Sequence, residues 1–332
     1  MRPLTYAQSG VDIAAENRSI DAMRAVFKGR RKGFGAPLTD IGHYAGLLDM
    51  GDFALAMTTD GVGSKVLVAN ILKKWDTVGI DCIAMNVNDL LAIGAEPIAF
   101  VDYLAVERTD PEQAAQIAVG LQRGAEISNM TIVGGETASL PEIIRGFDLA
   151  GTAIGVVDKG NVVTGDRIKE GDLIVGVPSS GLHSNGYTLA RRTIAQSRYT
   201  YFDMMPGSQK TIGEELLEPT RIYMEVLELI SECDVHGLAH ITGSGLLKLR
   251  RLTDLGFQID DPLDPQPVFT FLAQEGNVEE AEMYRTFNMG MGFAAVLPEG
   301  EAEDACRILG AGSKVVGRIV EKGIWLEGKE LL

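Results

Sequence analysis

The amino-acid sequence predicts an α+β protein with two domains. Helix-like and strand-like patterns are mixed along the chain, without the regular strand–helix–strand order of a doubly wound sheet. The length of 332 residues also favours two domains, because domains of about 100–200 residues are usual. A polar, turn-rich stretch at residues 158–172 separates the halves, so we expect one domain over residues 1–165 and a second over residues 166–332.

Composition excludes several classes of protein. Hydrophobic residues make up 45% of the chain and charged residues 23%, as in ordinary globular proteins. The net charge of −16 repels phosphate backbones, so we expect no nucleic-acid partner. The longest apolar runs, such as residues 154–157, are far shorter than the ~20 residues of a membrane span, so we expect no membrane partner.

Cysteine usage and the N-terminus indicate the compartment. Cys82, Cys233 and Cys306 are far apart and match no metal-ligand spacing. Residues 1–10 lack the basic start and apolar core of a signal peptide. Both observations predict reduced thiols in a cytoplasmic protein.

Each element of the first half has a local signal. Apolar side chains at helical spacing, from Ile20 to Phe27, predict the first helix. A later helix has Thr109 or Asp110 as its cap and Pro111 in its first turn. The expected elements are a helix near residues 20–27, a strand at 53–59, a helix at 76–93, a strand at 98–106, a helix opening at 109–112, and strands at 130–133 and 149–157.

The second half is mixed in the same way, with glycine-rich polar turns before its helices. The expected elements are a strand at 173–177, helices at 188–196, 219–232 and 246–253, and strands at 293–297 and 315–320. Glycine is frequent throughout, with 39 residues, well above the usual ~7% of a chain. Because glycine lets the backbone approach a ligand closely, these turns predict ligand-binding loops.

The first such loop is residues 59–65 (TDGVGSK), where a strand runs into a glycine turn. The carboxylate of Asp60 suits Mg²⁺, the backbone at Gly61 and Gly63 suits an anion, and Lys65 supplies a positive charge for a phosphate. The alternative is an ordinary hairpin turn, because Asp-Gly is common there.

Two further motifs carry oxygen ligands. Asn86 and Asp89 lie three residues apart and therefore share one face of an apolar helix, although Asp89 also suits a solvated helix end. Glu136 follows a short apolar strand in residues 134–137 (GGET). Three carboxylates, from Asp60, Asp89 and Glu136, predict a Mg²⁺ site for phosphoryl transfer.

Two turns with a histidine precede helices of the second half. His183, Ser184, Asn185 and Gly186 open one helix, where backbone N–H groups favour an anion. The second turn, which follows His240, contains Thr242, Gly243 and Gly245. A plain helix cap is the alternative for the first turn, but a cap does not explain the histidine. No hydrolase elbow, zinc-protease helix or kinase catalytic loop is present in the sequence.

These motifs together resemble the phosphoribosylformylglycinamidine cyclo-ligase (AIR synthetase) family. The resemblance extends along nearly the whole chain, in order and with fitting spacing. It rests on residues 6–13 (YAQSGVDI), 59–65 (TDGVGSK), 79–97 (GIDCIAMNVNDLLAIGAEP), 134–138 (GGETA), 180–189 (SGLHSNGYTL), 218–223 (EPTRIY) and 240–245 (HITGSG).

The resemblance implies ATP-dependent closure of the imidazole ring of purines, with formylglycinamidine ribonucleotide as substrate and Mg²⁺ as cofactor. It implies a homodimer whose N-terminal mixed sheets pair into a barrel, with C-terminal α+β domains outside. Site roles follow from it. We expect ATP at Gly33, Phe34, Gly35, Asp60, Gly61, Gly63, Lys65, Asn86 and Asp89; Mg²⁺ at Asp60, Asp89 and Glu136; substrate at His183, Ser184, Asn185, Gly186, Thr242, Gly243 and Gly245; and catalysis by Lys65, His183 and His240.

Some assignments stay open at this point. Either His183 or His240 could be the general base for the attacking nitrogen. The sequence has Ser244 where the family often has glycine, which puts the loop in doubt if that position needs a positive φ. Ala7 stands where many members have lysine. Related kinases, synthetases and maturation enzymes, or a silent nucleotide sensor, are the alternative functions.

Overall fold

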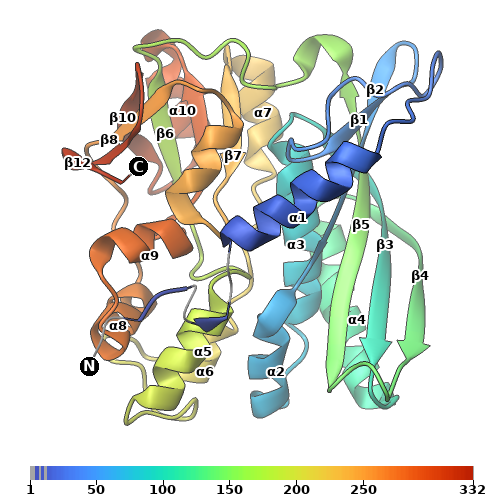
Figure 1. Ribbon diagram of the computed structural model, residues 1–332, viewed down its shortest axis with the longest axis vertical. Helices are drawn as coiled ribbons and strands as arrows, with labels where there is room; N and C mark the ends of the chain where they lie inside the picture. The colour runs from blue at the N-terminus through green and yellow to red at the C-terminus, as the bar shows by residue number, and fades with distance from the viewer. Residues whose placement is uncertain (1–3, 7–8, 11–12, 332) are drawn as a thin grey trace.

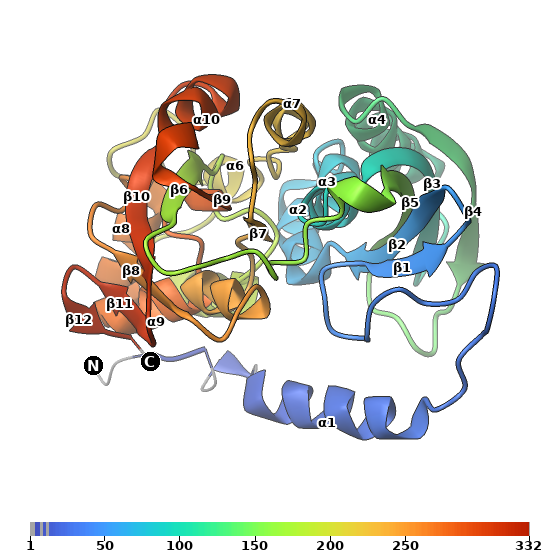
Figure 2. The ribbon, with the colours of Figure 1, turned by 90° about the horizontal axis from the view of Figure 1, so that it is seen from above.

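The computed structural model describes residues 4–6, 9–10 and 13–331. These residues form two sheets that stand side by side, each covered by its own helices (Figure 1, Figure 2). The first sheet ends with β5 at Asp158 and the second begins with β6 at Leu173, on either side of the polar stretch. The α+β class is therefore confirmed.

The first sheet is mixed and carries helices on one face (Figure 1). In β5, residues 149, 151, 153, 155 and 157 are buried whereas residues 148 and 158 are exposed, because alternate side chains point to opposite faces. Helix α3 is buried almost all round, so its apolar character is not confined to one stripe. The strand order is β1 (Gly46–Asp49), β2 (Phe53–Gly61), β5 (Phe147–Asp158), β3 (Glu96–Val106) and β4 (Thr131–Ser139), and the helices are α2 (Val66–Leu72), α3 (Val78–Leu91) and α4 (Pro111–Ile127).

Local capping explains where α4 begins. The Asp110 carboxylate accepts a hydrogen bond from the backbone N–H of Glu112 at 2.9 Å, and Pro111 occupies the first turn. Of the two residues expected to cap this helix, Thr109 and Asp110, the structure therefore shows Asp110 as the cap.

The second sheet has β6 and β9 near its centre, and every residue of β9 is buried. A strand buried on both faces has a continuous apolar sequence rather than an alternating one, as β9 does. The strand order is β12 (Lys329–Glu330), β11 (Ile324–Leu326), β8 (Gly256–Ile259), β10 (Lys314–Val320), β6 (Leu173–Pro178), β9 (Met291–Leu297) and β7 (Gly237–His240), and the helices are α5 (Tyr187–Gln196), α6 (Ile212–Leu216), α7 (Glu225–Glu232), α8 (Pro267–Gly276), α9 (Glu280–Thr286) and α10 (Ala302–Leu309).

Three expected elements differ from the structure. Residues 134–137 are part of β4 and not a turn after it, because they pair with β3. Residues 246–253 form the 3₁₀ helix η4 (Gly245–Arg251). The helix expected from residue 219 begins only at Glu225, because the backbone N–H of Thr220 donates to Asp81 of the other half instead of to a helix.

Helix α1 (Ile13–Val26) lies across the front of both halves and outside their cores (Figure 2). Its described side chains are mostly exposed, among them Met23 and Val26. Ala7 lies outside the described residues. Within the described chain, no helix combines the length and the apolar composition needed to cross a membrane.

Candidate active site

A cleft between the two halves brings together three of the predicted motifs. Its cavity has a volume of about 450 Å³. We call this cavity the interdomain cleft. Its walls come from residues 63–64 after β2, from the turn at residues 184–188, from Gly243, Ser244, Lys248 and Arg251 after β7, and from Tyr6 and Ile20 at the N-terminus.

Two carboxylates lie beside Lys248 of this cleft. Asp60 ends β2, on the sheet face that α3 covers, and Asp89 lies in the last turn of α3. Desolvation by the surrounding protein raises the pKa of Asp60, and the negative charge of Asp89 raises it further. One side of Asp60 remains open to solvent. Two neighbouring carboxylates, one of which has its pKa raised by the charge of the other, form a site suited to a cation.

His240 holds Asp89 in place. Its Nδ1 lies 2.9 Å from the Asp89 carboxylate, and its Nε2 lies 3.4 Å from the Asn88 side-chain nitrogen. The carboxylate accepts from Nδ1–H, so we assign the neutral tautomer whose Nε2 accepts from the Asn88 amide. Both ring nitrogens are therefore engaged, and the ring itself is buried.

His183 is buried behind His240, with ring centroids 6.4 Å apart. Its Nε2 accepts from the backbone N–H of Ser180 at 3.4 Å, and its Nδ1 has no partner among the described residues. Burial lowers the pKa of His183 well below its ordinary value. The histidine thus lies behind the 184–188 turn and is not among the residues that line the cleft, so its contact with substrate stays a prediction.

Lys65 also differs from the expectation. Its ammonium is fully buried, and it donates to Asp81 at 2.8 Å, to the His183 carbonyl at 3.0 Å and to the Glu218 carbonyl at 2.6 Å. An ammonium has three donors, so no donor is left for a phosphate. In this structure Lys65 therefore joins the two halves, and its assignment as a phosphate contact stays a prediction.

Asn86 connects the end of β2 to α3. Its side-chain amide donates to the Asp60 carbonyl at 3.2 Å and to the Cys82 carbonyl at 2.9 Å. This side chain is fully buried, so it fixes the backbone that carries Asp60 and lies outside the cleft itself.

Glu136 does not join the other two carboxylates within one chain. Strand register pairs Glu136 with Tyr103 and pairs Asp60 with Gly151, while Tyr103 pairs with Ala150. Neighbouring residues point to opposite faces, so Glu136 lies on the open face and Asp60 on the helix-covered face. No group of three acidic, histidine or cysteine side chains suited to a metal occurs in the described chain, so the expected triad is not formed.

The stretch with Gly33, Phe34 and Gly35 lies at the far end of the first sheet. The backbone N–H of Gly35 donates to the Asp49 carbonyl at 2.6 Å, beside the turn that joins β1 to β2. Seven residues of β2 separate Phe53 from Asp60, a span of about 23 Å at ~3.3 Å per residue. In this structure the stretch therefore lies away from Asp60, and its contact with ATP stays a prediction.

The turns at residues 183–186 and 242–245 meet each other. The Asn185 side chain packs so closely on Gly243 that a Cβ there would lie 2.7 Å from its oxygen. Ser244 has φ of 81°, the left-handed region that glycine occupies more readily. The serine thus keeps the turn that glycine would form, at a cost in backbone strain.

The sequence patterns missed Lys248 and Arg251, which both line the cleft. They lie in η4 after the glycine turn. Burial and the charge of Arg251 lower the pKa of Lys248 to about 8. In the sequence they belong to a basic run (KLRR) without a recognisable spacing, so only the fold distinguishes them from solvated cations.

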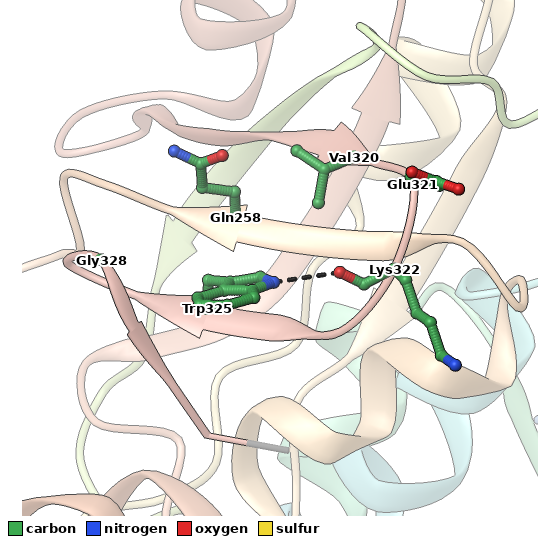
Figure 3. Close-up of a pocket in the computed structure, with 6 residues that line it drawn as sticks. All are labelled: Gln258, Val320, Glu321, Lys322, Trp325 and Gly328. Atoms are coloured by element: carbon green, nitrogen blue, oxygen red, sulfur yellow. Dashed lines mark hydrogen bonds between the residues drawn. The ribbon is translucent and has the colours of Figure 1, made fainter.

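A second hollow, of about 400 Å³, lies at the outer edge of the second sheet (Figure 3). The Trp325 indole N–H donates to the Lys322 carbonyl at 3.0 Å there. None of the expected site residues lines it, so we do not assign it to the active site.

Comparison with known proteins decides the family. The profile of the N-terminal domain of AIR synthase related proteins matches residues 42–157, and the C-terminal domain profile matches residues 169–325. A phosphoribosylformylglycinamidine cyclo-ligase from Methanosarcina acetivorans is 64% identical over 97% of this chain and 96% of that protein. The chain belongs to the phosphoribosylformylglycinamidine cyclo-ligase family. A relative of the same name from Thermococcus kodakarensis is 52% identical over 98% of each chain.

Solved structures of other proteins have the same fold as this member of the cyclo-ligase family. A thiamine monophosphate kinase from Aquifex aeolicus has a TM-score of 0.65 over 95% of this chain and 98% of that chain, at 16% identity. The hydrogenase maturation protein HypE in complex with ATP has a TM-score of 0.60 over 86% and 81%, at 19% identity. The fold is therefore shared with a thiamine monophosphate kinase and a hydrogenase maturation protein.

Proposed function

We propose that this chain closes the imidazole ring of formylglycinamidine ribonucleotide, using ATP and giving aminoimidazole ribonucleotide, ADP and phosphate. The observation that carries the proposal is the 64% identity to a cyclo-ligase over nearly the full length of both chains. The interdomain cleft supports it, because hydroxyl-rich turns and two cations line the cleft, and the carboxylates of Asp60 and Asp89 lie near one of these cations, Lys248.

The chemical problem is that a formamide oxygen is a poor leaving group. In the proposed route, ATP transfers its terminal phosphoryl group to that oxygen, and a nitrogen of the substrate attacks the activated carbon. The C–N bond of the ring forms, the C–O bond breaks, phosphate leaves and the nitrogen loses a proton. The protein mainly positions the reactants and neutralises charge.

Asp60 and Asp89 are the residues that fit Mg²⁺ in this chain. Their carboxylates offer oxygen ligands, and their mutual repulsion, which raises the pKa of Asp60, is relieved by a cation. Bound there, Mg²⁺ would neutralise the charge of the ATP phosphates. His240 keeps Asp89 oriented through its 2.9 Å contact, so we assign His240 a positioning role.

A homodimer is the second part of the proposal. The open face of the first sheet exposes large apolar side chains, including Met57, Val101 and Tyr103. Exposed apolar faces of this kind mark interaction surfaces, and pairing with a second copy would form the barrel. Glu136 lies on this same face, so it can reach a metal site only in the partner subunit.

Sedimentation velocity tests the dimer. Tyr103→Arg should shift the protein to the monomer, because it places a charge on the buried face of the barrel. Val119→Arg, on the solvent side of α4, should leave the dimer unchanged. A parent protein that sediments as a monomer at micromolar concentration would contradict the barrel.

The activity is tested with ATP, Mg²⁺ and formylglycinamidine ribonucleotide. We expect aminoimidazole ribonucleotide, detected by its diazo colour, together with ADP in a one-to-one ratio. Release of ADP with thiamine phosphate but not with this substrate would instead favour a kinase of the same fold, and ATP binding without either product would favour a sensor.

A further inference from the structure

Two cations of the interdomain cleft, Lys248 and Arg251, form no ion pair with the residues that the structure describes. Among those residues no hydrogen bond of either charged group is found, although the Tyr44 hydroxyl donates to the backbone carbonyl of Lys248 at 3.3 Å. The Arg251 guanidinium lies over the Tyr44 ring, 5.2 Å from its centroid. The chain has a net charge of −16, so acidic side chains that could pair with cations are abundant. Two neighbouring cations that line a cavity without forming an ion pair therefore indicate a site for an anion from outside the protein.

Neutral donors surround these cations in the cleft. The residues that begin α5, Tyr187 and Thr188, line it, and no side chain caps this helix end. The hydroxyls of Ser64 and Ser184 line it as well. Free N–H groups at a helix start, hydroxyls and cations are together the donor set of a phosphate site.

Lys248 also lies near the two carboxylates. The charges of Asp89 and Asp60 both act to raise its pKa, although burial and Arg251 outweigh them. Lys248 therefore lines the cavity and also lies near the two carboxylates expected to hold Mg²⁺. Lys65, the lysine expected for a phosphate, uses its ammonium entirely within the protein.

We propose that Lys248 and Arg251 together bind a phosphate group in the interdomain cleft, at the turn that follows the 242–245 motif. The group is a terminal phosphate of one of the two reactants, ester-linked in the ribonucleotide and anhydride-linked in ATP. The identity of the ligand therefore rests on the proposed function. It is either the 5′-phosphate of the ribonucleotide substrate or the terminal phosphate of ATP. Arg251 offers a planar pair of donors and Lys248 a compact charge.

Calorimetric titration of the full-length protein tests the proposal with two probes. Ribose 5-phosphate represents the substrate phosphate, and a non-hydrolysable ATP analogue with Mg²⁺ represents the nucleotide. The variants are Lys248→Met, which keeps the apolar stem, and Arg251→Ala. Arg250→Ala is the matched control, because Arg250 is the exposed neighbour on the same turn and does not line the cleft.

We expect Lys248→Met and Arg251→Ala each to weaken at least one probe by about tenfold or more, the effect of losing a charge-assisted hydrogen bond. Arg250→Ala should stay within twofold of the parent. Selective loss of ribose 5-phosphate assigns the substrate phosphate, and selective loss of the analogue assigns ATP. Lys248→Arg should restore most of the affinity.

Unchanged affinity for both probes in both variants would overturn the proposal. Circular dichroism on each variant separates this outcome from unfolding, and Arg251→Ala carries the test by itself if Lys248→Met does not fold. Activity of the parent on formylglycinamidine ribonucleotide is measured separately, so failure of the ring-closure assignment is distinguishable from failure of the phosphate site.

Discussion

The ammonium of Lys65 lies 2.8 Å from the Asp81 carboxylate, with both side chains inaccessible to solvent. Asp81 also accepts hydrogen bonds from the backbone and the hydroxyl of Thr220, and Lys65 donates to the carbonyls of His183 and Glu218. One buried ion pair of the first half thus fixes two turns of the second half. Burial lowers the pKa of Lys65 and raises that of Asp81, while their mutual attraction opposes both shifts.

Lys65→Met should destabilise the protein by about 3–5 kcal/mol, because it leaves the Asp81 charge buried without its partner. Urea unfolding of the ligand-free protein measures this free energy. Lys322→Met, at an exposed lysine, is the control and should change it little. A variant of parental stability with weaker ATP binding would instead restore Lys65 as a phosphate contact.

Asp89→Asn should lower kcat by about 100-fold or more, since loss of even an outer partner of a metal ligand costs ~10–100-fold. The amide oxygen can still accept from the His240 N–H, so the fold should persist. Steady-state kinetics at saturating substrate and circular dichroism measure the two effects. Asp254→Asn, at an exposed carboxylate, should retain parental activity, whereas near-parental cyclisation by Asp89→Asn would remove Asp89 from the site.

Asp60→Asn should raise the thermal unfolding midpoint of the metal-free protein near neutral pH. A carboxyl whose pKa is raised on folding destabilises the folded state increasingly as pH rises above its ordinary range, and the amide removes that repulsion. Mg²⁺ should raise the midpoint of the parent but not of the variant. Scanning calorimetry with and without Mg²⁺ checks this, and an equal Mg²⁺ effect on both proteins would contradict the assignment.

Affinity for the probe that Lys248→Met weakens, ribose 5-phosphate or the ATP analogue, should fall as pH rises above about 8, the pKa of Lys248. The phosphate is already a dianion there, since its second pKa is ~6, so the loss reports the lysine. Lys248 is flanked by Arg251 on its own turn and by Asp60, Asp89 and His240 on the facing strands and helix. Titrations without Mg²⁺ from pH 7 to pH 9.5 should show the decline in the parent and not in Lys248→Arg.

Ser244→Gly should preserve activity and raise stability by up to about 1 kcal/mol. Glycine removes the left-handed strain at φ of 81° and loses part of this gain through the greater freedom of the unfolded chain. Ser197→Gly is the comparison at a serine with φ of −84°, where the entropic loss and two lost hydrogen bonds apply, so it should destabilise the protein. Destabilisation of the protein by Ser244→Gly would show that the strain is absent.

The sequence by itself determined the features that depend on neighbouring residues. Asp110 caps α4 by accepting hydrogen bonds from backbone N–H groups two and three residues ahead, and the alternation along β5 decides which of its residues are buried. The motifs also indicated the family, since family membership requires only residue types in order. The same motifs predicted that Asp60, Asp89 and the two glycine turns belong to one site.

Only the tertiary structure decided which side chains face the cleft. Lys65 is buried by contacts more than 100 residues away in the sequence, and Glu136 is turned to the opposite face by strand register. Lys248 became a site residue because η4 packs beside Asp60 and Asp89. The physical reason is that burial and facing depend on long-range packing, which a local pattern of residue types does not contain.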